Sequence, residues 1–141
     1  MGKIVVGMDE SVNAVAALHW AIDHSDPATD EITVVRVWQF PVTGGMEALA
    51  FEWPDLEAEN MTILERSVAK ALEGVDNPPK IHNVVLEGHR GHKLIDEASG
   101  ADMIVVGSRG HGGFSGLLLG STSTYVVHHA PCPVVVVPTF E

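Results

Sequence analysis

The sequence predicts an α/β fold in which helices cover both faces of an open parallel β-sheet. Five short β-rich runs alternate along the chain with four segments of helical periodicity. Parallel neighbouring strands require a crossover between them, and this alternation supplies a helix for each crossover. With 45% hydrophobic residues, 141 residues can bury one ordinary core, so we predict a single domain over residues 1–141.

The first two strands are predicted at residues 3–8 and 31–38, with a helix between them. Ser11 is a suitable N-cap for that helix, which we expect to run to about Ser25. A second helix is predicted over residues 55–74, directly after a proline. Its apolar residues recur every three or four positions and charged residues lie opposite, which is typical of a helix packed on a sheet.

The second half of the chain continues the alternation. The predicted elements are a strand at 81–87, a helix at about 92–99, a strand at 103–106, a helix at 121–129 and a strand at 134–137. In open parallel sheets, ligands bind beyond the carboxyl ends of the strands, where the strand order reverses. Asp9 follows the first strand and a glycine-rich loop follows the fourth, so the two segments meet if those strands are neighbours.

The glycine-rich loop reads GSRGHGGFSGLLLGST over residues 107–122. A strand, a run of glycines and then Ser121 and Thr122 at a helix start bring free backbone N–H groups to one place. This arrangement indicates an anion site, most plausibly for phosphate, although glycines also serve tight turns. The loop lacks the Gly-Lys-Ser/Thr of a Walker loop, and the glycine spacing of a dinucleotide fingerprint does not follow the first strand.

These segments resemble the universal stress protein family, and specifically its nucleotide-binding branch. The family pattern of glycine, two residues, glycine, nine residues, glycine and serine or threonine is met by Gly107, Gly110, Gly120 and Ser121. The resemblance extends to IVVGMDES, ITVVRVW, LIDEASGADMIVVGSRGHGG and LLLGSTSTYVVHHAPCPVVVV. It implies a Rossmann-like, adenine nucleotide alpha hydrolase-like sheet of strand order 3-2-1-4-5. It also implies a dimer with ATP bound where strands 1 and 4 meet.

The resemblance also assigns roles to residues on both sides of the expected switch point. Asp9 would lie against the ribose, and the backbone of Val37 would pair with the adenine edge. A carboxylate can accept hydrogen bonds from two hydroxyls, and an apolar strand end can face a base, so the residue types suit these roles. Gly107 and Gly110 would allow the loop to approach the sugar and the phosphates.

The remaining predicted contacts surround the phosphates. Gly120, Ser121 and Thr122 would supply N–H and hydroxyl donors to the triphosphate. Ser108 and Arg109 stand between the first two glycines of the pattern and are included in the site, although a loop arginine is as often solvated. We predict no protein ligands for a metal, and expect Mg²⁺ to arrive on the ATP phosphates.

The formal net charge of −11 restricts the partners of this protein. Nineteen acidic residues against eight basic ones would oppose binding to nucleic acid or to an anionic membrane surface, and we expect neither partner. The same charge repels free nucleotides at long range, so a phosphate site must rely on local donors and a divalent cation. The start of the chain lacks the features of a leader, no apolar run reaches about 20 residues, and Cys132 is the single cysteine. We therefore expect a cytoplasmic protein.

Two functional classes stay open at this point. One is an ATP-binding regulatory module that acts in a stress response and whose protein partners are unknown. The other is a slow ATPase; the sequence offers no Walker lysine and no evident water-activating carboxylate beside the loop, so no catalytic residue is predicted. Within the first class, the ligand could instead be AMP or cyclic AMP, because these ligands differ only at the phosphate end.

Two further features of the sequence have more than one interpretation. His89 with His92, and His128 with His129, have metal-like spacing but no visible third ligand, so a histidine metal site is not expected. Segment 39–53 would either pack over the helices or a partner chain, or form a lid hinged at Gly44-Gly45.

The last predicted strand would lie at the sheet edge and mediate a homodimer through Val134, Val135, Val136 and Val137. In the alternative arrangement, residues 139–141 or the segment around Phe51 cover this edge within one chain.

Overall fold

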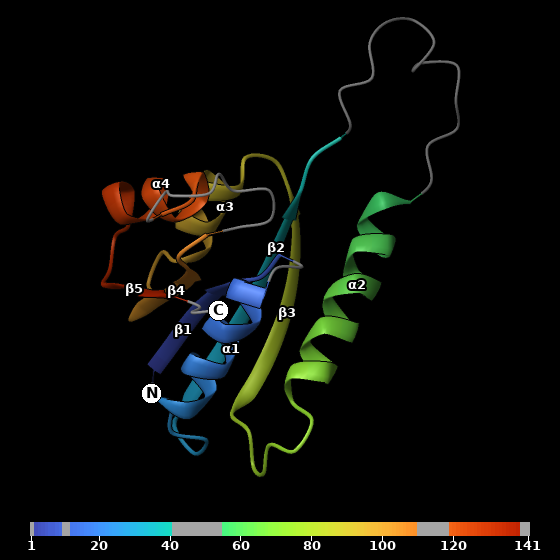
Figure 1. Cartoon of the computed structure of the whole chain (residues 1–141), viewed down its shortest axis with the longest axis vertical. Helices are drawn as coiled ribbons and strands as arrows, with labels where there is room; N and C mark the ends of the chain where they lie inside the picture. The colour runs from blue at the N-terminus through green and yellow to red at the C-terminus, as the bar shows by residue number, and fades with distance from the viewer. Residues whose placement is uncertain (1, 10–11, 41–54, 110–118, 139–141) are drawn as a thin grey trace, which may run out of the picture.

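The computed structural model describes residues 2–9, 12–40, 55–109 and 119–138, and its strands and helices alternate as predicted (Figure 1). In chain order the elements are β1 (Gly2–Gly7), α1 (Val12–Asp23), β2 (Asp30–Trp38), α2 (Leu56–Ala71), β3 (Lys80–Glu87), α3 (Arg90–Glu97), β4 (Met103–Gly107), α4 (Ser121–His129) and β5 (Val134–Val137). The five strands form one parallel sheet of order β3-β2-β1-β4-β5, which confirms the predicted fold class.

Strand β1 lies at the centre of this sheet and defines the switch point. It pairs with β2 on one side, from Gly2 opposite Asp30 to Gly7 opposite Val35, and with β4 on the other. The chain leaves β1 toward β2 in the first half and reaches β4 only in the second, so the connections depart in opposite directions at this point. The carboxyl ends of β1 and β4 therefore lie side by side, as a ligand site at the switch point requires.

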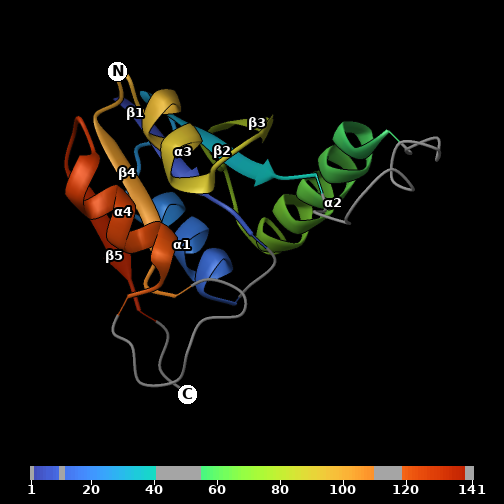
Figure 2. The ribbon, with the colours of Figure 1, turned by 90° about the horizontal axis from the view of Figure 1, so that it is seen from above.

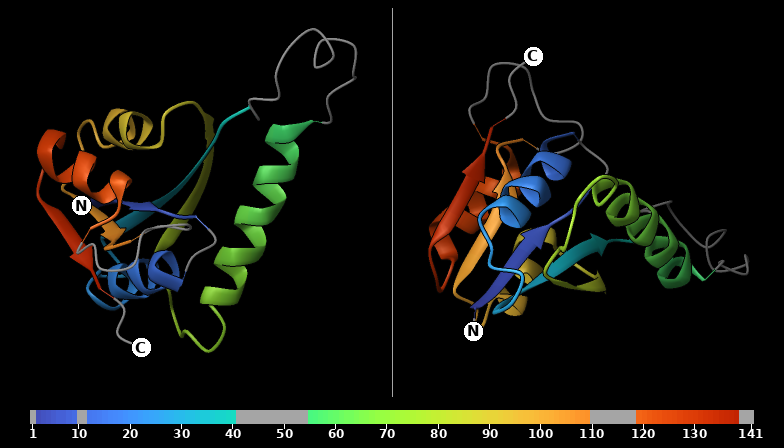
Figure 3. Two further views of the ribbon diagram at one scale, coloured as in Figure 1. Left: turned by 45° about the horizontal axis from the view of Figure 1, so that its top comes forward. Right: turned by 90° about the horizontal axis from the view of Figure 1, so that it is seen from below.

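Helices cover the two faces of the sheet in pairs (Figures 2 and 3). On one face α1 and α2 pack over a core that includes the fully buried Leu18, Ile32 and Leu64. On the other face α3 and α4 pack over Val5, Ile104 and other buried side chains. Because the strands are covered on both sides, apolar residues follow one another along them rather than alternating with polar ones.

The third helix begins two residues earlier than predicted. His89 is its N-cap, and the Nδ1 atom of His89 accepts a hydrogen bond from the backbone N–H of His92 at 3.1 Å. Histidine is not among the usual capping residues, which is why the sequence pattern placed the start at residue 92. The earlier start brings Arg90 into the first turn of α3.

Helix α2 is shorter than predicted and begins after a capping carboxylate. The Asp55 side chain accepts a hydrogen bond from the backbone N–H of Ala58 at 3.1 Å, and the helix ends at Ala71 rather than near Gly74. In Figure 1, α2 lies along β3 and leans away from the rest of the molecule.

Several sequence predictions lie outside the described residues. They are the Ser11 cap, most of segment 39–53 with its Gly44-Gly45 hinge, Gly110 in the glycine loop, and the C-terminal residues 139–141. Among the residues that are described, none of the helices combines the length and apolar character needed to cross a membrane.

Candidate functional site

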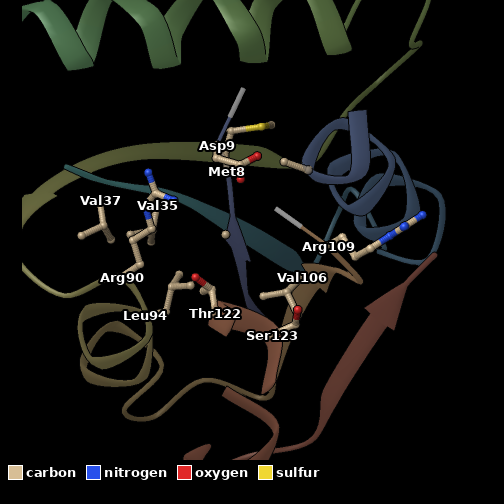
Figure 4. Close-up of a pocket in the computed structure, with 13 residues that line it drawn as sticks. Met8, Asp9, Val35, Val37, Arg90, Leu94, Val106, Arg109, Thr122 and Ser123 are labelled. Atoms are coloured by element: carbon tan, nitrogen blue, oxygen red, sulfur yellow. The ribbon is translucent and has the colours of Figure 1, made fainter. Parts of the chain in front are cut away.

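A cleft lies at the carboxyl ends of β1, β2 and β4, where the switch point was predicted (Figure 4). Strand ends, the start of α1 and the first turns of α3 and α4 all contribute to its wall. The lining residues are Gly7, Met8, Asp9, Ala14, Val35, Val37, Arg90, Leu94, Val106, Gly107, Arg109, Thr122 and Ser123. The predicted residues Asp9, Val37, Gly107, Arg109 and Thr122 are thus brought together from four separate segments.

Val37 presents backbone polar groups to this cleft. In a parallel strand, alternate residues direct their N–H and C=O groups to opposite neighbours. The N–H of Met8 donates to the carbonyl of Val35 at 2.8 Å, and that of Gly88 donates to the carbonyl of Trp38 at 2.9 Å. Val37 therefore faces the β1 side, and the β1–β2 register ends before it, at Gly7 opposite Val35. Its donor and acceptor lie beyond the last rung of the ladder, at the cleft.

The walls beside Val37 are apolar and end in one carboxylate. Met8, Val35, Leu94 and Val106 are buried and line the cleft, and they form a slot suited to the faces of a planar ring. Asp9 is half-buried and lies next to Met8, across the cleft from Leu94 and Thr122 in Figure 4. The slot thus combines an apolar surface, a backbone edge and a carboxylate.

Gly107 lines the cleft, and the structure gives a reason for the glycine other than ligand approach. A Cβ atom there would lie 2.6 Å from the Cβ of Asn13 and 2.7 Å from its backbone C and O atoms. No side chain fits, because the first turn of α1 packs directly on the end of β4. The glycine therefore sets the separation between α1 and β4 at the edge of the site.

Ser108 lies behind the cleft rather than on its wall. Its carbonyl accepts hydrogen bonds from the backbone N–H of Gly120 at 2.7 Å and from the hydroxyl of Ser123 at 2.9 Å. Its own N–H donates to the carbonyl of Val137 at 3.0 Å. Ser108 therefore fixes the start of α4 against the ends of β4 and β5. Its inclusion in the ligand site stays a prediction.

The start of α4 supplies the donors predicted for phosphate, with one exception. Gly120 is the N-cap, and no side chain caps the helix. Its N–H already donates to Ser108, and its φ of −76° is accessible to any residue. Thr122 reaches the cleft together with Ser123, which the sequence analysis missed, while Ser121 faces an adjoining hollow. The first-turn N–H groups of α4 have no intrahelical acceptor and can meet an anion.

Two arginines lie on the cleft wall, and only one was predicted. Arg109 follows β4, and in Figure 4 its side chain extends away from the other labelled residues, toward α1. Arg90 comes from the first turn of α3, and its side chain rises beside Val35 and Val37. The signal that could have found Arg90 is its place just after the third strand, because the carboxyl ends of parallel strands share one edge of the sheet.

The cleft continues into a larger hollow between α3 and α4. The cleft has a volume of about 60 Å³ and the hollow one of about 500 Å³, and both are lined by Arg90 and Thr122. The other residues of the hollow are Gln39, His89, Gly91, Ser121 and Tyr125. Ligand pockets usually span roughly 300–1,000 Å³, so the cleft alone is too small for a ligand of ordinary size and the hollow adds the missing volume.

The histidines do not form a metal site with other described residues. Within residues 2–9, 12–40, 55–109 and 119–138, no three histidine, cysteine or acidic side chains are grouped to hold a metal ion. His89 caps α3, and the Nδ1 atom of His92 lies 3.3 Å from a carboxylate oxygen of Asp96. The metal-like spacing in the sequence reflects helix capping and an i, i+4 pair.

The chain belongs to the universal stress protein family, because the model of that family matches residues 1–138. A universal stress protein of Mycolicibacterium smegmatis is 31% identical over 134 residues, which cover 95% of this chain and 45% of the relative. One of Mycobacterium tuberculosis strain H37Rv is 32% identical over 133 residues, which cover 94% of this chain and 44% of the relative. The chain therefore spans less than half the length of these curated relatives.

Solved structures share the fold over nearly the whole chain. The hypothetical protein MJ0577 superposes with a TM-score of 0.80 at 22% identity, covering 99% of this chain and 96% of that one. A universal stress protein in complex with cAMP gives a TM-score of 0.72 at 21% identity, covering 99% and 98%. A family member from Arabidopsis thaliana with AMP bound gives 0.65 at 20% identity, covering 100% and 94%.

Proposed function

We propose that this member of the universal stress protein family binds ATP in the cleft and acts as a nucleotide-dependent regulatory module in a stress response. Adenine occupies the apolar slot and pairs with the backbone of Val37, while the ribose hydroxyls donate to Asp9. The phosphates extend toward Ser121 and Thr122 at the start of α4. The observation that carries the proposal is the placement of Val37, whose N–H and C=O face an apolar slot beyond the last β1–β2 rung.

The adenine part of this proposal has support from two proteins of the same fold. One structural neighbour is a universal stress protein in complex with cAMP and another, from Arabidopsis thaliana, has AMP bound. The alternative ligands for this chain are accordingly AMP and cyclic AMP. They would use the same slot and would differ from ATP in how much of the hollow between α3 and α4 they fill.

Calorimetric titration of ligand-stripped protein tests the proposal. Three or four charge-assisted hydrogen bonds contribute roughly 1.5–3 kcal/mol each, and after ordering costs we expect about 8 kcal/mol, a micromolar dissociation constant. Mg-ATP, AMP, cyclic AMP and GTP are titrated in parallel. We expect Asp9→Asn to weaken ATP binding, because an amide offers one oxygen acceptor in place of two. An absence of heat and of thermal stabilisation at millimolar Mg-ATP would contradict the proposal.

Mg²⁺ should affect ATP binding because it reduces the negative charge of the ligand. The chain carries a formal net charge of −11, which repels ATP until the local donors are reached. We expect Mg²⁺ to strengthen ATP binding by reducing the ligand's charge, and moderate salt to raise the association rate. Association rates that fall steeply with salt would indicate a locally basic entrance instead.

A slow ATPase is the alternative function. Bound triphosphate could be hydrolysed slowly, but we propose no catalytic residue, because Asp9, the acidic residue among those that line the cleft, is assigned to the ribose in this proposal. Phosphate release over hours at saturating Mg-ATP measures this directly. Turnover above about 1 s⁻¹, the lower end of typical enzyme rates, would favour the enzymatic reading.

We also infer a homodimer formed through β5. This strand is an edge of the sheet, and its four valines are each half-buried. The N–H of Ile104 donates to the carbonyl of Pro133, and that of Ser108 donates to the carbonyl of Val137. Val134 and Val136 therefore direct their backbone groups away from β4, and a second copy of β5 could pair with them.

The variant that tests the dimer should disrupt the edge of β5 with little damage to the core. Val134 and Val136 pack against the core beneath α3 and α4, so a lysine at position 136 would disturb that core as well as the edge. Val136→Pro removes the outward N–H and keeps an apolar side chain at this position, and proline is tolerated on the free side of an edge strand. Light scattering should give about twice the 15.1 kDa chain mass for the wild type and a lower mass for this variant. A wild-type chain that stays monomeric at high concentration defeats the inference.

A further inference from the structure

We propose that Arg90 binds the phosphates of the nucleotide from the α3 side, opposite the start of α4. Its positive charge would make the binding affinity depend on the charge of the ligand. The inference rests on the proposed function, since it concerns the same bound nucleotide. Three observations support it: the position of Arg90 in the walls of both compartments, the absence of an ion pair to its guanidinium among the described residues, and the polar character of the larger compartment.

Arg90 stands where the two compartments join. It lines both the apolar cleft and the hollow of about 500 Å³, and Thr122 is the other residue that does so. In Figure 4, Arg90 and Thr122 approach the cleft from different helices, with the Arg90 side chain beside Val35 and Val37. A nucleotide with its base in the slot and its phosphates in the hollow would therefore have both residues beside it.

The guanidinium of Arg90 is available for a ligand. Its side chain is exposed, and across the part of the chain that the structure describes it forms no ion pair or hydrogen bond with another side chain. Only eight of the 141 residues are basic, so an unpaired cation at the cleft is a local departure from the acidic character of the chain. It provides the attraction that a phosphate needs against a formal net charge of −11.

The chemistry of the two compartments favours phosphate over base as the group that Arg90 binds. The slot is lined by Val35, Val37, Leu94 and Val106, which offer a base contact surface without side-chain acceptors. The hollow shares Thr122 with the cleft and adds the hydroxyl-bearing Ser121 and Tyr125 and the amide of Gln39. An arginine has five donors and no acceptor, and phosphate, which has oxygens on every side, can accept from it and from the start of α4 together.

The test compares ligands that differ only in phosphate. ATP, AMP and adenosine are titrated calorimetrically against the wild type, Arg90→Gln and Arg90→Lys, with circular dichroism to confirm that each variant folds. Lys80→Gln is the matched control, because it removes one positive charge at the opposite end of β3, where Lys80 is exposed. This control separates a local contact from a general change in net charge.

We expect Arg90→Gln to weaken ATP binding by about tenfold and adenosine binding by less than twofold. Arg90→Lys should recover part of the loss, because it keeps the charge but not the planar fork, and Lys80→Gln should stay within twofold of the wild type. Equal losses for ATP and adenosine, or no loss for ATP, overturn the role of Arg90 while leaving the proposed function intact. A wild-type protein that binds no ATP refutes the proposed function itself.

Discussion

The two faces of the sheet are built differently. Among the described residues, the α1–α2 face has helices of twelve and sixteen residues and a core cluster of fifteen buried side chains, helix residues included. The α3–α4 face has helices of eight and nine residues and a cluster of eight. Both short helices begin at the candidate site and contribute Arg90, Leu94, Thr122 and Ser123 to its wall. We infer that the first face provides most of the stability and the second provides most of the ligand contacts.

The largest expected effect tests the stabilising role of the α1–α2 face. Leu18 is fully buried in α1, and Leu18→Ala should lower the free energy of unfolding by about 3–5 kcal/mol, through lost burial and the cavity left behind. Urea denaturation measures the change. Val127, which is 46% exposed on α4, gives the control Val127→Ala, expected within about 0.5 kcal/mol. Similar losses for both variants would remove the distinction between the faces.

A pair of glycine substitutions compares close approaches on the two faces. A Cβ at Gly107 meets the backbone of Asn13 in α1, whereas a Cβ at Gly91 meets the Tyr125 ring at 2.5 Å. Backbone cannot move aside as a side chain can, so Gly107→Ala should cost about 2–3 kcal/mol and Gly91→Ala about 1 kcal/mol. Thermal and urea unfolding of both variants check this order. A larger loss at Gly91 would mean that the α3–α4 packing is the less adaptable of the two.

The capping carboxylate of α2 should give a smaller effect. Asp55→Ala removes the acceptor for the Ala58 N–H and should lower the free energy of unfolding by about 1 kcal/mol. Glu57→Ala in the same first turn is the control, because it removes an exposed charge without a capping bond. ATP affinity should be unchanged in both variants, since neither residue lines the cleft. An altered affinity would show that α2 is coupled to the site.

The smallest effect concerns the thiol below α4. Burial, with a lesser contribution from the negative charge of Asp102, raises the pKa of the Cys132 thiol above its usual value. The thiolate fraction near pH 8 is therefore reduced, and iodoacetamide should react more slowly with the folded protein than with the urea-unfolded chain. The rate should rise at a higher pH in the folded state. Coincident pH profiles, followed by mass spectrometry, would mean that this end of the α3–α4 face is open to solvent.

Local patterns predicted the elements, and contacts between distant residues decided what they do. The five strands were recognisable because each is a short apolar run bounded by turn residues. Asp9 was predicted from the end of the first strand, Thr122 from a helix start and Val37 from the family resemblance alone, and all three line the cleft. The start of α3 was wrong, because histidine capping has no strong sequence signal, and Arg90 was missed with it.

The sequence also could not show which distant residue a glycine or serine contacts in the folded chain. Gly107 and Ser108 read as parts of a phosphate loop, yet one accommodates Asn13 and the other binds the start of α4 through its carbonyl. Asn13 is 94 residues from Gly107 in the chain, and Gly120 is 12 from Ser108. A glycine or serine marks a close approach or a hydrogen bond, and only the folded chain identifies the partner.

The position of Val37 beyond the last β1–β2 rung has a consequence for how this site can change over evolutionary time. The groups that would read the base belong to the main chain, and every residue except proline carries the same donor and acceptor. Substitutions of Val37 can therefore alter the shape of the slot, while the backbone N–H and C=O at this position stay the same. If the proposed function holds, base selectivity would be protected in this sense from most single-residue substitutions, and variation would fall on the side chains that meet the phosphates.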